Sequence, residues 1–461
     1  MRNLVTIFFG TRKQKYSEPK LYELRMARRR SFGQQTSSIM ERIWQALWLS
    51  KQDSLIFGEF RAIDMLKRGY LAYAVAAVGL LGGCSKDKDD TKPNPDPDPI
   101  KKEIAIAYNN DADLWHNTAT ISVKGNTDGK EFAVQYRATG SQKWANAVKA
   151  GKDTFRIEPT YDDTPAEGKR LAYKTLTQGT GVRPHSNYDV RLLAGTEVVA
   201  TTSFATATAK EEIPNAGMDH WCEHKVEGMF VGGTVASPNK EGSENFWASG
   251  NNGRTTKLCT NGKTAGCNGT GCAVLKGETA MGVFAAGNIF TGVMEFGAGI
   301  SEMGAGYARF GQKHIFNARP TALKVRIDAT LGIIDKIKDE LKEQIKPNTK
   351  DKARIFFCIT DWRDRHTVQG GLMSDKNTFW NPDEQSSVSE GKILGYGQLD
   401  ITEDTAGWKE ITIPVRWYDT AAKPTDGNYS LVISAASSAL GDYLTGSTKS
   451  AMSIEDFEWV Y

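Results

Sequence analysis

The chain has 461 residues, a hydrophobic content of 39% and a formal net charge of +3, from 58 Lys and Arg against 55 Asp and Glu. This composition is typical of a folded chain, and the near-neutral charge excludes a polybasic nucleic-acid binder. The length predicts two or three domains. The charge is unevenly distributed, since residues 1–64 carry +6 and residues 65–83 carry +2, which leaves −5 on residues 84–461.

The first element in chain order is a short export signal that begins at Met65. Two basic residues precede an apolar run, residues 71–81, that is too short to span a bilayer permanently. The run ends in Leu81-Gly82-Gly83-Cys84, which resembles the lipobox of bacterial lipoproteins, where the signal is cut before a cysteine that carries a lipid. We predict a signal peptide over 65–83 and lipidation of Cys84; a short buried helix is the alternative.

The segments on either side of this signal fit the same interpretation. A signal peptide acts at a true N-terminus, so residues 1–64 are predicted to be an upstream mis-start or a disordered extension, with a genuine basic extension as the alternative. Residues 84–100 are acidic with alternating prolines, which indicates an extended tether. An acidic run after the cysteine also resembles the export signal of surface lipoproteins in some Gram-negative gut bacteria. We therefore expect an outer-membrane, lipid-anchored protein at the cell surface or on the periplasmic face.

Residues 101–209 are predicted to form an immunoglobulin-like or fibronectin-like β-sandwich. Short runs of alternating apolar and polar residues predict strands over 104–108, 118–124, 131–139, 154–160, 187–193 and 198–206. Trp144 is expected to be a core aromatic. Modules of this kind are usually spacers, and we expect that role here.

Residues 210–461 are predicted to form a second, larger β domain. Its predicted strands cover 322–327, 353–360, 408–415, 429–435 and 451–461. Ile333, Ile337 and Leu341 recur at helical spacing and predict one amphipathic helix over 331–346, inserted between strands. Residues 228–311 hold 19 of the 45 glycines, which indicates a loop-rich face suited to binding.

Histidine and cysteine offer one candidate metal motif. On a strand, the segment His220-Trp221-Cys222-Glu223-His224 would point two imidazoles and a thiol to one side. No C-x₂-C pair accompanies it, so we predict no metal site there. In an exported protein, one or two disulfides are expected instead among four cysteines, with the pairing left open, and Cys358 is expected to be a free, buried thiol. The four are Cys222, Cys259, Cys267 and Cys272.

Several aromatic residues have polar or small neighbours, a mixture that sugar binding requires because a flat ring stacks on the sugar while fixed polar groups bind its hydroxyls. They are Trp247, Trp362, Trp380, Trp417 and Tyr443. Filling of a sandwich core is the alternative for each. On this chemistry we select Trp417 and the neighbouring carboxylate of Asp361. Individual carboxylates could be catalytic, but spacing pairs no two of them, so catalytic residues are not assigned.

Four motifs, in order along the chain, resemble one known family. They are Ala286-Gly287-Asn288-Ile289-Phe290-Thr291-Gly292, Ala318-Arg319-Pro320-Thr321-Ala322-Leu323-Lys324, Ser437-Ser438-Ala439-Leu440-Gly441-Asp442-Tyr443-Leu444-Thr445-Gly446 and Met452-Ser453-Ile454-Glu455-Asp456-Phe457-Glu458. They look like the putative carbohydrate metabolism domain family of bacterial lipoproteins, over roughly residues 211–461. The resemblance implies a C-terminal β jelly roll behind an Ig-like domain, with a sugar-binding pocket. Ile213-Pro214-Asn215 and Trp247-Ala248-Ser249-Gly250-Asn251 match the family's opening motifs more loosely. Carried over by motif, the pocket candidates are Trp247, Asn251, Arg319, Ser438, Asp442 and Tyr443.

The sequence thus predicts an all-β lipoprotein whose jelly roll binds an oligo- or polysaccharide. Its partners would be carbohydrate and, through the lipid anchor, a membrane, with no nucleic acid. No cofactor is expected, although a structural calcium ion stays open because many jelly-roll modules hold one. We favour a binding protein over an enzyme. The alternatives are a hydrolase acting on glycosides through two pocket carboxylates and a structural or adhesive surface protein without a small ligand.

Overall fold

The computed structural model describes residues 6–9, 12–15, 104–125, 127–209, 212–263, 266–280, 282–371 and 377–461. The predicted signal peptide, the lipidated Cys84 and the tether over 84–100 lie outside the described residues. Near the N-terminus, strand β1 (Thr6–Phe9) pairs with β2 (Arg12–Lys15).

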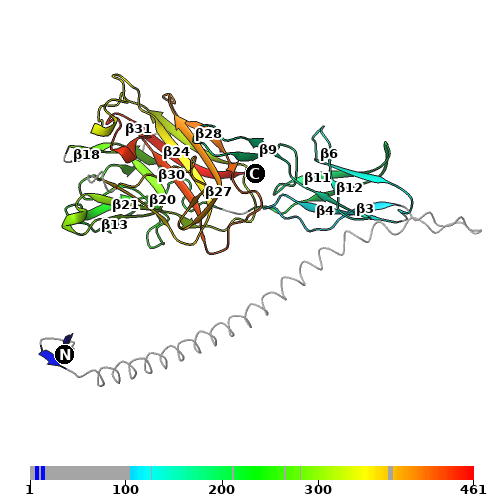
Figure 1. The fold of residues 1–461 in the computed structure, drawn as a ribbon, viewed down its shortest axis with the longest axis horizontal. Coiled ribbons are helices and arrows are strands. Elements are labelled where there is room, and N and C mark those ends of the chain that lie inside the picture. The colour runs from blue at the N-terminus through cyan, green and yellow to red at the C-terminus, as the bar shows by residue number, and fades with distance from the viewer. Residues whose placement is uncertain are drawn as a thin grey trace, which may run out of the picture. The chain divides into compact units, whose positions relative to one another are not determined.

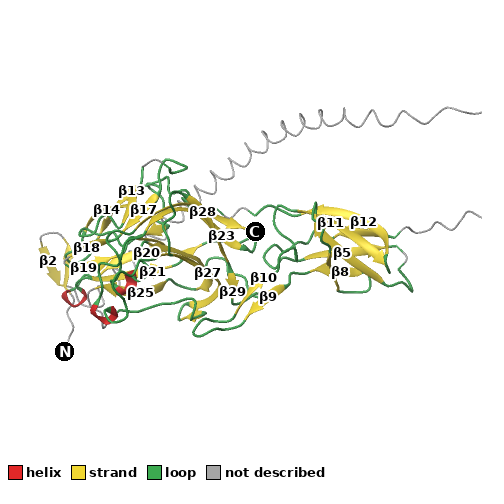
Figure 2. Cartoon of the chain, turned by 90° about the horizontal axis from the view of Figure 1, so that it is seen from above, coloured by secondary structure: helices red, strands yellow, loops and turns green. Residues whose placement is uncertain are grey.

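The fold is all-β, as the sequence predicts (Figures 1 and 2). Within the described residues, the helical segments are 3₁₀ turns of three residues each, at η1 (Ile300–Glu302), η2 (Asp339–Leu341) and η4 (Gly441–Tyr443). None of the described segments is a helix with the length and apolar character needed to cross a membrane.

Residues 104–209 contain a sandwich of two four-stranded sheets, here called the smaller sandwich. One sheet has the order β3 (Ala105–Tyr108), β4 (Ala119–Lys124), β8 (Thr154–Ile157), β7 (Val148–Lys149). The other has the order β12 (Glu197–Ala205), β11 (Asn187–Ala194), β5 (Phe132–Ala138), β6 (Ala145–Asn146). Alternate residues of both sheets bury a common core that includes Ile121, Val134 and Leu192. The sandwich is confirmed, while its immunoglobulin-like classification stays a prediction.

The expected core position of Trp144 is wrong. Its ring lies between two guanidinium groups, with Arg137 Cζ 4.4 Å and Arg191 Cζ 4.2 Å from the ring centroid. Both arginines belong to strands of the same sheet, and all three side chains are partly exposed. An aromatic ring stacked between two cations is stable at a surface, so apolar character alone did not place this residue.

Residues 212–461 form a larger sandwich built on two main sheets. The five-stranded sheet has the order β16 (Cys259–Asn261), β17 (Ala273–Lys276), β31 (Ala451–Val460), β23 (Ala322–Thr330), β28 (Lys409–Pro414). The twelve-stranded sheet has the order β25 (His366–Gly371), β21 (Ala305–Phe310), β20 (Asn288–Phe296), β30 (Tyr429–Ala436), β24 (Ala353–Trp362), β27 (Gly391–Ile401), β29 (Arg416–Trp417), β10 (Tyr173–Leu176), β9 (Tyr161–Thr164). Strands β15 (Trp247–Ala248), β22 (Gln312–Lys313) and β26 (Ser387–Val388) pair off this path.

The alternation of the central strands explains how the two sheets pack. On β24, Ala353, Ile355, Phe357 and Ile359 are fully buried and join a core that also holds residues of β23 and β31 from the other sheet. Two hairpins complete the domain: β13 (Cys222–Val226) with β14 (Gly233–Ser237), and β18 (Glu278–Ala280) with β19 (Val283–Ala285). Figure 1 shows β24, β27 and β30 side by side at the centre of the larger sandwich.

The predicted helix over 331–346 is wrong, because this segment is an irregular loop. Its first half bonds to other segments, with Ile334 N donating to Thr349 O at 2.9 Å and Lys336 N to Gly446 O at 3.1 Å. Its second half holds only the short 3₁₀ turn η2 and a few local turn bonds. Asp335 also accepts bonds from Thr448. Isoleucines at helical spacing suit a helix only when no tertiary partner competes for the backbone.

The two sandwiches share one sheet, and residues of the smaller one enter the core of the larger one. The hairpin β9–β10 leaves the smaller sandwich and adds to the twelve-stranded sheet, with Lys174 opposite Trp417 of β29. Trp115 of the smaller sandwich is 1% exposed and belongs to the core cluster of the larger one. Its Nε1 donates to Ala422 O at 2.8 Å. The chain therefore passes from the smaller sandwich to the larger one near residue 209, and the two sandwiches contact each other extensively.

Candidate functional site

One face of the twelve-stranded sheet is turned away from the main core and is partly open to solvent. Residues directly opposite each other in an antiparallel pair share a face, and so do residues two apart on one strand. The register therefore places two rows on this face, which we call the outer face: Asp400, Arg354, Ala436 and Asn288 in one, and Gln398, Phe356, Ser434 and Phe290 in the next.

A chain of polar contacts runs along the outer face from β24 to β27. Arg354 binds Asp400 through two bonds, Nε to Oδ1 at 2.7 Å and Nη2 to Oδ2 at 3.0 Å. Gln398 Nε2 donates to Asp400 Oδ1 at 3.3 Å, and the hydroxyl of Tyr396 donates to Gln398 Oε1 at 2.5 Å. The side chains of Arg354 and Asp400 are 35% and 27% exposed.

These contacts fix the polar groups without using all of them. Arg354 Nη1 donates to none of the described residues, so one charge-bearing donor is free to meet a ligand. The hydrogen bond and the charge of Asp400 raise the pKa of Arg354, against the effect of burial. The guanidinium is therefore permanently charged and held in one orientation.

Aromatic rings lie next to the polar chain on the same face. Trp380 packs against Phe310, Phe356 and Trp362, with ring centroids 5.4, 5.8 and 5.5 Å away. Phe356 also lies 6.5 Å from the ring of Tyr396. The small side chains of Ser434 and Ala436 lie in the same two rows. The outer face thus combines fixed polar groups, aromatic rings and small residues.

Two residues predicted by motif, Asp442 and Tyr443, lie at the edge of this face. Tyr443 is 40% exposed, and its ring stacks on that of Phe379 at 4.3 Å and 8°. Asp442 touches solvent, yet protein atoms crowd around its carboxyl, and this desolvation raises its pKa, while the charge of Arg354 opposes the effect.

Five other predicted ligand residues are buried, and the described contacts already occupy most of their polar atoms. Trp247 and Trp417 are each 1% exposed and belong to the main core. Asn251 joins two segments, with Nδ2 donating to Cys259 O at 2.6 Å and Oδ1 accepting from Cys259 N at 3.0 Å. Ser438 donates to Asp351 at 2.6 Å. None of these four lies on the outer face; Arg319 is the fifth.

Arg319 is fully buried where the two sandwiches meet. Its Nη1 donates to the Tyr161 hydroxyl at 2.5 Å and its Nη2 to Thr420 O at 2.7 Å. Its guanidinium lies 5.1 Å from the ring of Trp115 and 4.8 Å from that of Trp417. Burial lowers the pKa of Arg319, and the Tyr161 hydroxyl opposes this. The residue holds the sandwiches together and is sealed from ligands.

Asp361, chosen on chemistry, fixes a loop. Its carboxylate accepts from Thr425 N at 2.9 Å and from Asn428 Nδ2 at 2.7 Å. The residues that sequence reasoning missed are Arg354, Gln398 and Asp400. Each alternates with apolar neighbours on its strand, which is a visible signal. Their convergence depends on pairing between positions 46 residues apart, and the sequence does not show that pairing.

Cysteine chemistry is concentrated in one loop. Cys267 and Cys272 form a disulfide five residues apart, which is one of the expected pairings, while Cys222 and Cys259 are free. Cys358 is free and fully buried, as predicted. Burial raises the pKa of its thiol well above the usual value.

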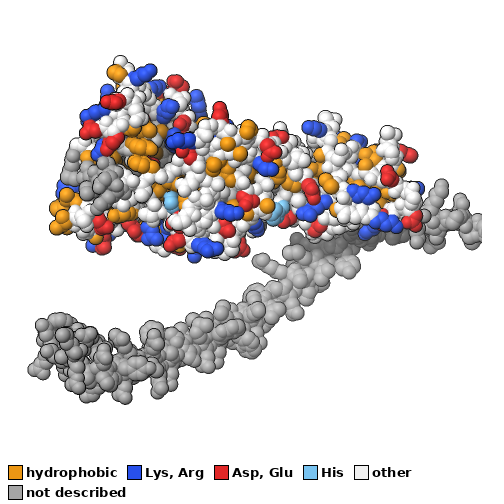
Figure 3. All heavy atoms as spheres, in the orientation of Figure 1, with side chains coloured by type: hydrophobic (Ala, Val, Ile, Leu, Met, Phe, Trp, Pro, Cys, Tyr) orange, Lys and Arg blue, Asp and Glu red, His pale blue; other side chains and the backbone are white. Residues whose placement is uncertain are grey.

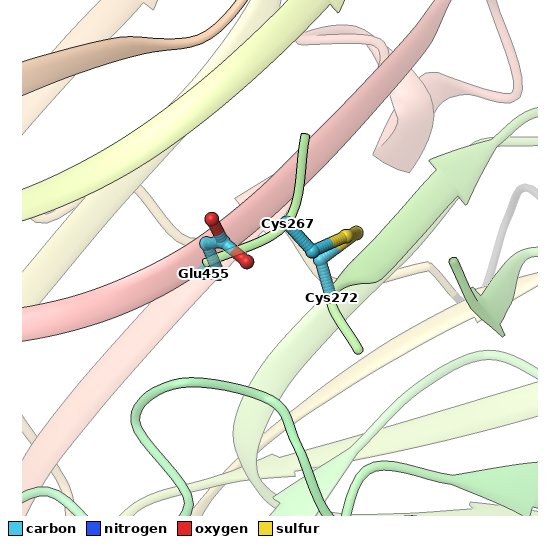
Figure 4. Close-up of side chains that lie close together, drawn as sticks. All are labelled: Cys267, Cys272 and Glu455. Carbon is cyan, nitrogen blue, oxygen red and sulfur yellow. A yellow bond between two sulfur atoms is a disulfide. The ribbon is translucent and has the colours of Figure 1, made fainter. Parts of the chain in front are cut away.

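Cys267, Cys272 and Glu455 form the single group of potential metal ligands found in the described part of the chain, with ligand atoms within 4.8 Å of one another. Figure 4 shows the sulfur atoms joined and directed away from the carboxylate of Glu455. Metal binding by cysteine requires thiolates, which a disulfide does not provide. Glu455 is bound instead by Arg326 and by Asn268 N at 3.0 Å. The His220–His224 segment forms no such group.

The fold and the site define an all-β protein of two joined sandwiches with a polar and aromatic outer face. The profile of the family described as "Putative carbohydrate metabolism domain" matches residues 205–460, more than half of the chain, and the chain belongs to this family. No curated protein matches it.

Two solved structures resemble the chain. One is titled a putative glycoside hydrolase from Bacteroides thetaiotaomicron VPI-5482, with 18% identity over 73% of this chain and 99% of that chain and a TM-score of 0.35. The other is titled a putative glycoside hydrolase from Bacteroides vulgatus ATCC 8482, with 16% identity over 54% and 99% and a TM-score of 0.36.

Proposed function

We propose that this protein binds carbohydrate on the outer face of its larger sandwich. Membership of a carbohydrate-metabolism family supports the ligand class. The observation that carries the proposal is the fixed chain Arg354–Asp400–Gln398–Tyr396 beside the rings of Phe356 and Trp380. A sugar ring stacks on an aromatic side chain through its C–H face, while charged and amide groups bind its hydroxyls. Figure 3 shows charges of both signs interspersed over the visible surface of the molecule.

The test is a glycan array followed by titration of the best ligand into wild-type protein and the variant Arg354→Gln. We expect at least a tenfold loss of affinity in the variant, since a charge-assisted bond to a hydroxyl and the orientation of Asp400 are both lost. The matched control is Arg137→Gln, which removes a similarly exposed arginine paired with Asp189 in the smaller sandwich. Wild-type protein that binds no glycan, or equal losses in both variants, would contradict the proposal.

Catalysis is a second candidate, because Asp442 is an exposed carboxyl at the edge of the outer face, close to Arg354, and desolvation raises its pKa. A general acid of a glycoside hydrolase needs a carboxyl that stays protonated near neutral pH. The enzyme hypothesis predicts release of reducing ends from a bound polysaccharide, abolished in Asp442→Asn while affinity is retained. Binding without any release of reducing ends would refute the enzyme hypothesis and support binding as the sole function.

We further propose that a lipid on Cys84 anchors the protein in the outer membrane. Its support is the sequence Leu81-Gly82-Gly83-Cys84 after a short apolar run. We expect that cells expressing the full chain incorporate radiolabelled palmitate into it, and that Cys84→Ser abolishes incorporation and releases the protein from membranes. Cys222→Ser is the control. Unchanged labelling in Cys84→Ser would refute the anchor.

A further inference from the structure

A cavity lies beside Arg365 and Tyr429, at the end of β24 opposite to Arg354. Its volume is about 560 Å³, within the range of small-molecule sites. It is lined by the loop before β15, by β22, by Arg365 in the turn after β24 and by Tyr429, the first residue of β30. Tyr429 lies opposite Trp362, eight positions along β24 from Arg354. The residues that line the cavity include none of Arg354, Asp400, Gln398, Tyr396, Phe356 and Trp380, so the cavity is distinct from the outer face site.

Positive charge dominates this cavity. Lys240, Lys313 and Arg365 line it together with a single carboxylate, Glu244. None of the three cations forms an ion pair with a carboxylate in the described residues. By contrast, Arg137, Arg309, Arg354 and Arg416 elsewhere in the molecule are each paired. Uncompensated cations around one cavity raise the local concentration of anions.

Two of the cations, Lys313 and Arg365, lie over the ring of Tyr429. Arg365 Cζ lies 4.8 Å and Lys313 Nζ 5.5 Å from the ring centroid of Tyr429. Arg365 is directed further by Nε donating to Gly311 O at 3.1 Å and Nη2 to Gln312 Oε1 at 3.3 Å. A guanidinium fixed by its own donors costs little further ordering when it binds an anion.

The wall between the cations is rigid and polar. Gln312 is 5% exposed, and its Nε2 donates to Asn245 O at 2.9 Å and Phe246 O at 3.0 Å. Asn239 is 2% exposed and accepts from Phe246 N at 2.9 Å. Buried amides thus fix the loop that carries Lys240 and Phe246, so the cavity is formed before any ligand arrives.

We infer that this cavity binds an anionic saccharide unit, one bearing a carboxylate or a sulfate. Lys313 and Arg365, positioned by the ring of Tyr429, bind the anionic group, and Phe246 offers apolar surface to the sugar ring. The saccharide part of this inference rests on the proposed carbohydrate function, whereas the preference for an anion rests on the three unpaired cations alone.

Titration calorimetry of the full chain tests the inference with two probes, an oligogalacturonate and a sulfated oligosaccharide of equal length. We expect binding of at least one probe, weakened by added salt and reduced at least tenfold in Lys313→Gln/Arg365→Gln. The charge-matched control, Lys143→Gln/Lys409→Gln, removes two lysines outside the cavity and should bind as wild type. The probe that binds more tightly identifies the anionic group.

The outcomes separate the two sites. Loss of probe binding in Arg354→Gln, with none in Lys313→Gln/Arg365→Gln, would overturn the inference and assign the ligand to the outer face. Inorganic sulfate binding as tightly as the oligosaccharides would overturn the saccharide assignment. Wild-type protein that binds neither probe would refute the cavity's role. Probe binding with no neutral glycan bound would support the cavity and contradict the outer face proposal.

Discussion

Arg319 shows how a single residue can look like a ligand-binding group and serve the fold instead. An arginine in a family motif suits either role, because the guanidinium binds sugar hydroxyls and backbone carbonyls equally well. Here burial between Trp115 and Trp417 decides the matter. The fold tolerates this buried charge because its hydrogen bonds and the aromatic faces compensate for lost water.

Replacing Tyr161 with Phe removes only the oxygen that accepts from Arg319 Nη1. We expect the free energy of unfolding to fall by about 2 kcal/mol, since a buried charged donor is left without its partner. Urea denaturation measures the change. Tyr307→Phe is the control, because its hydroxyl donates to an exposed Glu302 at 3.2 Å and should matter little. An equal effect in both variants would contradict the role given to Arg319.

At the scale of elements, the strands were predictable and the loop over 331–346 was not. Strands β23, β24, β28, β30 and β31 all fall on runs whose alternation is visible in the sequence. The loop contains isoleucines at helical spacing, but its backbone bonds to Thr349 and Gly446. Those partners are set by how the strands assemble, so local periodicity could not predict them. The burial of the motif residues Trp247, Asn251, Arg319 and Ser438 also depends on how the strands assemble, so the sequence did not predict it.

Asp335 makes this loop sensitive to acid. Burial would raise its pKa, but bonds from the Thr448 hydroxyl and Thr448 N lower the pKa overall. A carboxyl with a lowered folded pKa stabilises the fold above its ordinary value of 3.8, and this contribution is lost as the pH falls through the folded pKa.

We therefore expect Asp335→Asn to be less stable than wild type at pH 7, by less than about 1 kcal/mol because the residue is exposed. The difference should narrow as the pH falls below 3.8. Urea midpoints at pH 7, 5 and 3 measure it, with the exposed Asp426→Asn as control. A difference that is constant with pH would show that the charge of Asp335 is not involved.

At the scale of the whole molecule, the two sandwiches form one structural unit. Trp115 lies in the core of the larger sandwich, and β10 pairs with β29. The sequence predicts the two sandwiches in the right order but presents the smaller one as a spacer. The hairpin that joins them consists of polar strands with no apolar alternation, such as Tyr161-Asp162-Asp163-Thr164. The sequence therefore does not show that these strands join the twelve-stranded sheet.

We expect residues 104–461 to unfold in a single thermal transition. Unfolding the smaller sandwich alone would expose Trp115 and leave Arg319 without Tyr161, which couples the two parts energetically. Differential scanning calorimetry of the full chain checks this through the ratio of van't Hoff to calorimetric enthalpy. Two separate peaks, or a ratio well below one, would contradict the coupling.

The hairpin β9–β10 also bears on how the protein can be divided. A fragment beginning at residue 205, where the family match starts, would lack both strands and leave the edge of β29 that faces away from β27 unpaired. An unpaired sheet edge is a template for strands of other molecules, and natural proteins usually cover such edges. We therefore expect such a fragment to associate edge to edge with its own copies, and the intact chain, whose hairpin covers this edge, to remain apart.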